Sequence, residues 1–193
     1  MTAAGFSPLT ALHSSKSIEH YTPPRYIAAA RLVMGSIELD PASCEAANRT
    51  VQAIRFYTAG DDGLTQPWHA ATVWCNPPYG RDPKRNHQAF IRRMLASYTA
   101  GQVEQAMLLV NSSTGERWFK PLWSYWICFL YERIEFVDEC CSPQKSPTHS
   151  NVIVYFGPHT QRFADIFRAF GRIVPSDDQA LSTQHSIWDR GVA

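Results

Sequence analysis

The sequence predicts an α/β protein in which a mostly parallel sheet forms the middle of three layers. Short apolar runs rich in β-branched residues alternate along the chain with segments whose apolar residues recur at helical spacing. Three of the apolar runs end in a polar residue, namely Asp40, Asn76 and Asn111. Alternating strands and helices form parallel sheets covered on both faces, and such sheets bind ligands beyond the carboxyl ends of their strands. We therefore expect the three polar residues to lie along one rim of the sheet.

The length and composition fit a single folded domain. The chain has 193 residues, of which 45% are hydrophobic and 12% aromatic, which is enough for a sizeable core. We expect this core to span residues 14–175 and to be followed by a polar, mobile tail at 176–193. No apolar run is long enough to cross a bilayer, and Met1–Pro8 lacks the basic and apolar regions of a secretion signal. A cytoplasmic protein without a membrane partner is therefore expected.

The five cysteines do not form a paired framework. Cys140 and Cys141 are adjacent and cannot easily bridge each other, so reduced thiols are expected. His149 lies close enough in sequence to these two cysteines for a zinc site to be considered. A fourth ligand is not evident, and no metal is expected.

The first helix has a clear start and end in the sequence. Thr22 followed by Pro23 predicts an N-cap hydroxyl with proline in the first turn. Apolar residues then recur at helical spacing as far as Met34, and Gly35 ends the segment. The same criteria give the next elements as a strand over 37–40, a turn at 41–43, a helix opening at 44–48 and strands over 54–57 and 72–75.

The second half of the chain continues the alternation. Helical spacing of apolar residues predicts a helix from Phe90 to Tyr98 that ends near Gly101. The strands over 133–136 and 152–156 are joined by a long polar loop and are expected to pair as an antiparallel hairpin at the sheet edge. The remaining elements are a strand over 106–110, a helix over 117–123, a strand over 126–130, a helix over 163–170 and a strand over 172–174.

The strand over 72–75 leads into the stretch that carries the clearest chemistry. It stops at Pro77 and Pro78, neither of which can donate a ladder hydrogen bond. Asn76 is thereby left at the carboxyl end of the strand, before a stiff turn and the ring of Tyr79. The Asn76 side-chain oxygen and the Pro77 carbonyl can each accept an N–H of a planar exocyclic amine, while Tyr79 lies against the ring. The alternative is a strand that ends in a proline turn beside an exposed tyrosine.

The segment from residue 81 to residue 93 is strongly basic. It contains one acidic residue, Asp82, and five basic residues, which leave a net charge of +4: Arg81, Lys84, Arg85, Arg92 and Arg93. Its position directly after the amine-binding stretch favours contact with nucleic-acid phosphates. A solvated helix face would explain the same charges.

Several short motifs, taken in order, resemble the phage-type DNA N6-adenine methyltransferase (Dam) family. The resemblance covers about residues 14 to 157. It is carried by Ser14-Ser15-Lys16-Ser17, Tyr21-Thr22-Pro23, Leu39-Asp40-Pro41-Ala42-Ser43, Asp62-Gly63-Leu64, Pro67-Trp68, Asn76-Pro77-Pro78-Tyr79-Gly80 and Arg133-Ile134-Glu135-Phe136. The Asn-Pro-Pro-Tyr tetrapeptide alone is only moderately specific, because RNA and protein-glutamine methyltransferases also use it. The resemblance implies a Rossmann-like fold that binds S-adenosylmethionine (AdoMet) and methylates adenine N6 in DNA.

The resemblance assigns catalysis to Asn76, Pro77, Pro78 and Tyr79. The adenine amino group is a poor nucleophile because its lone pair is delocalised into the ring. Accepting both N–H groups favours a localised lone pair, and the two oxygens stabilise the positive charge that develops on nitrogen. Tyr79 would stack on the extruded base.

The resemblance also implies a cofactor site. Tyr21, Thr22 and Pro23 match the segment that closes over the methionine part of AdoMet. Asp40 is expected to accept from the methionine ammonium, and Asp62, or else Asp61, to meet the adenosine. The full set expected at the cofactor is Tyr21, Thr22, Pro23, Asp40, Pro41, Ala42, Ser43, Asp61, Asp62 and Gly63. One departure is that the turn at 41–44 contains no glycine, which would weaken close approach of its backbone to AdoMet.

The chain has no room for a separate target-recognition domain. Base contacts are expected from the basic segment, from the loop over 137–150 with Lys145 and His149, or from a second subunit, and the chain is expected to act as a monomer or homodimer. The residues expected to bind nucleic acid are Arg81, Lys84, Arg85, Arg92 and Lys145. The resemblance suggests a phage-encoded enzyme that modifies DNA in the bacterial cytoplasm. The alternatives are methylation of RNA or of a protein glutamine, and a decayed methyltransferase fold that only binds nucleic acid or blocks restriction.

Overall fold

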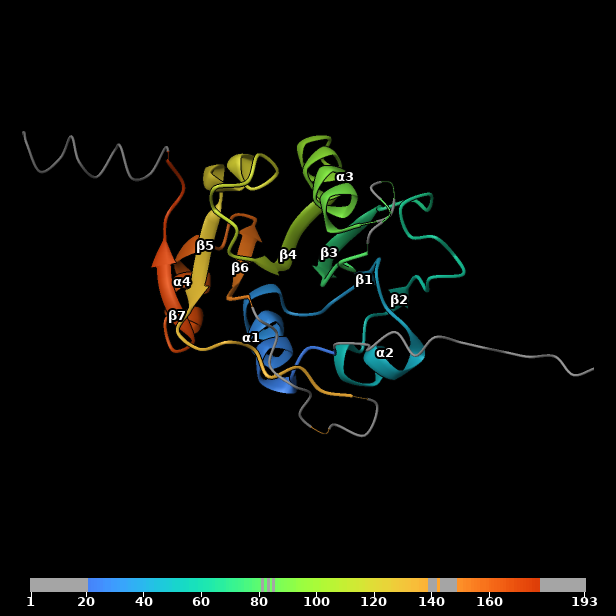
Figure 1. The fold of residues 1–193 in the computed structure, drawn as a ribbon, viewed down its shortest axis with the longest axis horizontal. Helices are drawn as coiled ribbons and strands as arrows, with labels where there is room; N and C mark the ends of the chain where they lie inside the picture. The colour runs from blue at the N-terminus through green and yellow to red at the C-terminus, as the bar shows by residue number, and fades with distance from the viewer. Residues whose placement is uncertain are drawn as a thin grey trace, which may run out of the picture.

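A seven-stranded sheet forms the centre of the computed structural model, which describes residues 21–80, 82, 84, 86–138, 142 and 149–177. The strand order is β2-β1-β3-β4-β6-β5-β7. Four neighbouring strands run parallel, and each of the other three is antiparallel to its neighbours (Figure 1). The strands are β1 (Leu39–Asp40), β2 (Arg55–Phe56), β3 (Ala70–Cys75), β4 (Val103–Asn111), β5 (Trp126–Leu130), β6 (Asn151–Phe156) and β7 (Gly171–Val174).

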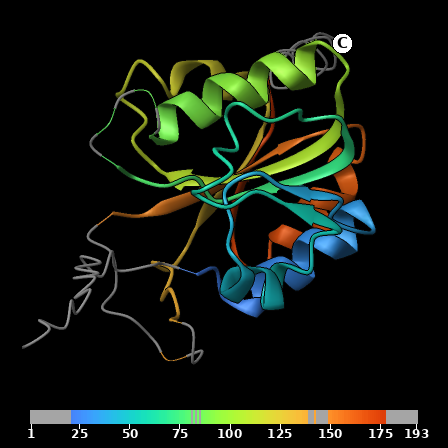
Figure 2. The same ribbon diagram turned by 90° about the vertical axis from the view of Figure 1, so that its right-hand side faces the viewer.

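Helices cover both faces of this sheet. The helix α3 lies on one face, whereas α1 and α2 lie on the opposite face (Figure 2). The helices α1 and α4 contribute to the same apolar cluster, which places α4 on the side of α1. The helical elements are α1 (Pro24–Met34), α2 (Glu45–Val51), α3 (His87–Thr99), the short 3-10 helix η1 (Lys120–Ser124) and α4 (Thr160–Phe167). Within the described part of the chain, no helix is long and apolar enough to cross a membrane.

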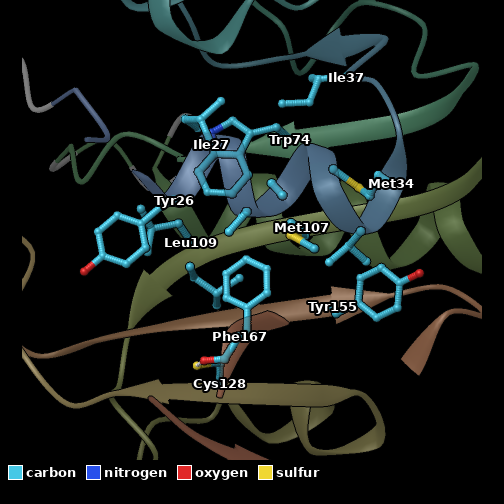
Figure 3. Packing of buried hydrophobic residues seen from close by; sticks show 14 of the residues in the cluster. Tyr26, Ile27, Met34, Ile37, Trp74, Met107, Leu109, Cys128, Tyr155 and Phe167 are labelled. Atoms are coloured by element: carbon cyan, nitrogen blue, oxygen red, sulfur yellow. Dashed lines mark hydrogen bonds between the residues drawn. The ribbon is translucent and has the colours of Figure 1, made fainter. Parts of the chain in front are cut away.

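The central strands β3 and β4 are apolar and buried over most of their length, as expected of strands covered on both faces. Trp74 of β3 and Met107 of β4 point to the side of α1 and α4, where they pack with Ile27 and Phe167 (Figure 3). The alternate residues of the same strands pack in a second cluster with residues of α3 and η1. Two apolar clusters therefore fix the sheet from both sides.

All the predicted strands except that over 133–136 are confirmed, with shifts at their ends, and so are the first helix and the helices predicted at 44–48, 90–98 and 163–170. The strand at 126–130 is β5 as predicted, and the strand at 172–174 is β7 with one more residue. The predicted segment 106–110 is the centre of a longer strand, β4. The helix expected after Pro23 is α1. Residues 14–20 of the predicted core and residues 178–193 of the predicted tail lie outside the described part.

The predicted hairpin between 133–136 and 152–156 is wrong. The second segment is β6, which lies between β4 and β5 and is antiparallel to both rather than at the edge. All six of its residues are buried, as befits a strand with neighbours on both sides. Residues 133–136 form no strand, although Ile134 and Phe136 are buried and their neighbours exposed. This extended segment covers the core without joining the sheet. Its buried and exposed residues alternate as they do in a strand, which explains the wrong prediction.

The helix predicted over 117–123 is only partly confirmed, because the structure has turns at 117–119 followed by the 3-10 helix η1. Phe119 and Leu122 are both fully buried and are three residues apart. A spacing of three matches the 3-10 helix, in which residues i and i+3 eclipse. Pro121 lies in the first turn of η1, where its missing N–H costs nothing.

The order of the strands reverses between β1 and β3. After β1 the chain adds β2 on one side and then returns to place β3 on the other side of β1. In open α/β sheets, ligands bind beyond the carboxyl ends of the strands at such a reversal. Asp40 is the last residue of β1, and Asn76 directly follows β3. The topology therefore places both residues at the position where a ligand site is expected.

Candidate functional site

A pocket of about 80 Å³ opens beyond the carboxyl ends of β1 and β3. It brings together six of the residues predicted to form a site, although they come from three separate parts of the chain: Tyr21, Thr22, Asp40, Ala42, Ser43 and Asn76. Four further lining residues were not predicted, and these are Cys44, Ala47, Val51 and Trp74. Ala47 and Val51 are one helical turn apart on α2, and Trp74 is the buried residue two positions before Asn76. Their spacing relative to the predicted residues is the signal that could have identified them.

Asn76 is oriented by Thr22. The Asn76 Nδ2 group donates a hydrogen bond to Thr22 Oγ1 at 3.4 Å, so its Oδ1 lies on the other branch of the amide. Thr22 was predicted to cap α1, but the N-cap is Pro23 and no side chain caps the helix. The Thr22 hydroxyl is buried and faces the pocket instead. A hydroxyl at this position therefore serves the site rather than the helix.

Asp40 is an acid with little contact to water. Its side chain is 3% exposed, and its Oδ1 accepts from the Ala42 N–H at 3.2 Å. Burial raises the pKa of Asp40 to about 7, while the Ala42 N–H and the neighbouring Ser43 hydroxyl act in the opposite direction. The buried Ser43 Oγ has no well-formed hydrogen bond among the described residues. The pocket thus contains an acid whose ionised form a cation would stabilise. It also contains a buried hydroxyl that a ligand could satisfy with a hydrogen bond.

The turn after β1 is held without glycine. Cys44 caps α2, because its Sγ accepts from the Ala47 N–H at 3.4 Å and also donates to the Tyr21 hydroxyl at 3.5 Å. Tyr21 in turn pairs with Val137 through two backbone hydrogen bonds of 3.0 Å. The N-terminal segment is therefore attached at the pocket from two sides, by the start of α2 and by residue 137.

The glycine that this region requires lies in another loop. A Cβ on Gly63 would lie 1.9 Å from the Pro41 carbonyl oxygen, so the two backbones touch. The Gly63 carbonyl also accepts from the buried Trp68 Nε1 at 2.7 Å. Gly63 thus supports the turn after β1 from behind, and neither it nor Pro41 is among the residues that line the pocket.

Replacing Gly63 with alanine is expected to destabilise the protein by about 2–3 kcal/mol, because the added methyl group must displace backbone rather than a flexible side chain. The shift of Pro41 should also weaken ligand binding in the pocket. Urea denaturation of Gly63→Ala against wild type measures the first effect. Gly115→Ala is the matched control, since a Cβ there meets nothing within 4 Å. Equal stability of the two variants would contradict the close approach.

Asp61 and Asp62 have structural roles in the same loop. The Asp61 Oδ2 accepts from the Thr58 N–H and hydroxyl at 2.8 and 2.7 Å, and these bonds lower the pKa of Asp61. Asp62 has a positive φ of 52°, a backbone conformation that aspartate tolerates better than most residues. Neither residue lines the pocket, and their contact with adenosine stays a prediction.

Tyr79 lies at the rim next to the end of β4. The Asn111 backbone N–H donates to its hydroxyl at 2.5 Å, and its ring stacks on His87. The Asn111 side chain accepts from Asn151 at 3.1 Å. The expectation that Asp40, Asn76 and Asn111 share one rim is met, because β1, β3 and β4 are parallel neighbours. Sequence analysis did not identify His87 or Asn151.

The structure describes only part of the predicted basic surface. Lys84 and Arg92 are exposed, in agreement with contact to a polyanion, whereas Arg93 is half-buried and donates to the Gln66 carbonyl at 3.3 Å. Arg81, Arg85 and Lys145 lie outside the described residues. The possible zinc ligands Cys140 and Cys141 lie outside them too. No group of three or more metal-ligating side chains occurs in the part that is described.

Comparison with protein families connects the chain with a known family. The family model described as DNA N-6-adenine-methyltransferase (Dam) matches residues 11–179. The match includes every pocket residue and the whole segment from Asn76 to Tyr79. Comparison with curated proteins gives no match.

Proposed function

The chain belongs to the DNA N-6-adenine-methyltransferase (Dam) family, and on this premise we propose that it transfers the methyl group of AdoMet to adenine N6 in DNA. One observation supports the proposal most strongly: Asp40 and Asn76 line one pocket at the reversal of strand order. An ammonium-binding acid and an amine-binding amide must be close neighbours if a methyl group is to pass from a bound amino acid derivative to a base.

The residues of the pocket fit the methionine end of AdoMet. The buried Asp40 gains from an ammonium group, because a cation offsets the cost of ionising a desolvated acid. The Ser43 Oγ is available for a further polar contact. Tyr21 and Thr22 would close over the same end of the ligand. When bound, AdoMet supplies an electrophilic methyl group on a sulfonium sulfur.

The chain itself acts on the adenine amine. In our proposal the Asn76 Oδ1 and the Pro77 carbonyl each accept one N6 hydrogen, which localises the nitrogen lone pair. As the nitrogen gains positive charge, these two oxygens stabilise it more than they stabilise the ground state. Pro78 stiffens the turn that presents the Pro77 carbonyl. No general base is needed for attack, since the extra proton can leave afterwards.

The fold and the surface support a compact version of this enzyme. Helices on both faces of a sheet that is parallel in its centre agree with a three-layer, Rossmann-like methyltransferase domain that comprises the whole chain. Exposed Lys84 and Arg92 follow the catalytic segment and would contact DNA phosphates. We propose a short or relaxed target sequence, as expected of an enzyme that makes few base contacts. We also propose a phage-encoded, cytoplasmic enzyme that acts as a monomer or homodimer.

Incubation with tritiated AdoMet and unmethylated DNA, followed by digestion to nucleosides, tests the proposal. Label in N6-methyladenosine supports it. Label confined to RNA or to protein glutamine would replace it with the corresponding amine methyltransferase. AdoMet binding in calorimetry without any labelled product would indicate a decayed enzyme that only binds.

AdoMet binding is expected to tighten as pH rises from 5.5 to about 7. The reason is that Asp40, with its pKa raised to about 7, must lose its proton before it can hold an ammonium group. The affinity should change by up to about tenfold per pH unit in this range and level off above it, before the amine itself deprotonates near pH 8. Calorimetry in buffers of different ionisation enthalpy should show proton release on binding at pH 6. A pH-independent affinity would show that Asp40 does not meet the ammonium.

A further inference from the structure

The ring of Tyr79 is held from behind by an aromatic stack that the sequence did not reveal. The rings of Tyr79 and His87 lie nearly parallel, with centroids 4.4 Å apart and an interplanar angle of 21°. Trp118 meets His87 edge-on, at 4.9 Å and 80°. The three rings come from the segment after β3, the start of α3 and the turn after β4. Residues from the start of α3 and from the turn after β4 therefore meet behind one tyrosine.

Each member of this stack is anchored by its own element. His87 is the first residue of α3, where the Asn86 Oδ1 caps the helix by accepting from Gln88 and Ala89. Trp118 packs on Phe119, which is fully buried in the core. The stack is therefore continuous with the rigid part of the protein, whereas Tyr79 itself is 45% exposed.

His87 makes its contacts through its ring faces and edges. Its Nδ1 is buried and has no hydrogen-bond partner among the described residues. Burial also lowers the pKa of His87, which favours the neutral imidazole. A ring that stacks on Tyr79 and also contacts Trp118 is suited to support the tyrosine.

We infer that His87 is a positioning residue, which holds the Tyr79 ring so that its opposite face is ready to stack on the target adenine. This inference rests on the proposed function and adds the residue that prepares the stacking surface. The Asn111 N–H holds the hydroxyl end of Tyr79, and His87 holds its face. An exposed tyrosine without this support would have to be ordered each time a base is extruded.

The cost of ordering one side chain sets the size of the effect. His87→Ala is expected to lower kcat about 3- to 10-fold, the factor that corresponds to immobilising one side chain. The KM for DNA should stay within about twofold, because phosphate contacts dominate DNA affinity. His87→Phe keeps a flat ring and should restore kcat. In a Tyr79→Ala background the His87→Ala change should have little further effect, because His87 acts through Tyr79.

A measurement without DNA tests the same contact. The Asn111 amide donates to the Tyr79 hydroxyl, so loosening Tyr79 should speed hydrogen exchange of that amide. Exchange of the Asn111 amide in His87→Ala should be about 3- to 10-fold faster than in wild type. Tyr79→Phe is the reference variant, because it lacks the hydroxyl that accepts from this amide. Unchanged exchange, or an equal loss of kcat in the Tyr79→Ala background, would overturn the inference. Absence of label in DNA with wild-type protein would instead overturn the proposed function, while the exchange result would still decide whether His87 holds Tyr79.

Discussion

Asn76→Ala is expected to lower methyl transfer to DNA by at least about 10²- to 10³-fold, the usual loss when one preorganised group that stabilises transition-state charge is removed. In our proposal the Asn76 side chain accepts an N6 hydrogen. Alanine leaves this hydrogen without an acceptor and leaves the positive charge that develops on N6 without its stabilising oxygen. Affinity for AdoMet should change by no more than about threefold, because Asp40 and Ser43 hold the other end of the pocket. Single-turnover transfer and calorimetry on the same preparation measure the two quantities.

Two further variants separate the role of the amide oxygen from that of the fold. Asn76→Asp keeps an oxygen acceptor and should retain much more transfer than alanine. Thr22→Val removes the hydroxyl that accepts from Asn76 while preserving its shape, and should lower transfer by only about 3- to 10-fold. If Asn76→Ala lost AdoMet binding together with transfer, the residue would belong to the cofactor site instead.

Asp40→Asn should weaken AdoMet binding by about 10²- to 10³-fold, because it leaves a bound ammonium without its buried counter-charge. The same variant should make the ligand-free protein more stable at alkaline pH. In the folded state the pKa of Asp40 is raised to about 7, whereas in the unfolded chain it is near the ordinary value of 3.8. Between these two values the unfolded state ionises first, so wild-type stability falls as pH rises through this window and then stays low.

Asparagine cannot ionise and escapes this loss. At pH 4 the two proteins should unfold at similar urea concentrations, and at pH 8 Asp40→Asn should be more stable by up to about 4 kcal/mol. Saturating AdoMet should remove most of this difference at pH 8, because binding that is about 10²- to 10³-fold tighter to wild type offsets about 3–4 kcal/mol. Asp165→Asn is the matched control, because Asp165 is an exposed acid on α4 outside the pocket, and it should leave AdoMet affinity unchanged. Greater stability of wild-type protein at pH 8 without ligand would contradict the burial of a charged Asp40.

The site was more accessible to sequence analysis than the sheet was. The polar residues that end β1 and β3 could be predicted to meet, because the rule for parallel strands needs only strand order and direction. Thr22 was assigned to the wrong partner, since a Thr-Pro pair is typical of a helix start and its bond to Asn76 spans distant segments. His87 could not be found at all, because nothing local to residue 87 indicates that Tyr79 and Trp118 will lie on either side of it.

The errors in the sheet have a common physical origin. Residues 133–136 and β6 both show patterns that suit a strand, but sequence spacing does not tell which edge a strand will join. β6 pairs with β4 and β5, so it lies between two strands that both precede it in the sequence. The close approach of Gly63 to the Pro41 backbone could not be predicted either, because only the folded arrangement of two loops creates this contact.

The place of β6 also governs how this protein can be made. Until residue 151 has left the ribosome, β4 and β5 each lack a neighbour, and both expose unpaired backbone groups next to apolar side chains. A nascent chain halted before that point would be prone to aggregate, and the sheet can close only after β6 has been made. We therefore expect pausing of synthesis between β5 and β6 to favour aggregation more than pausing after β6.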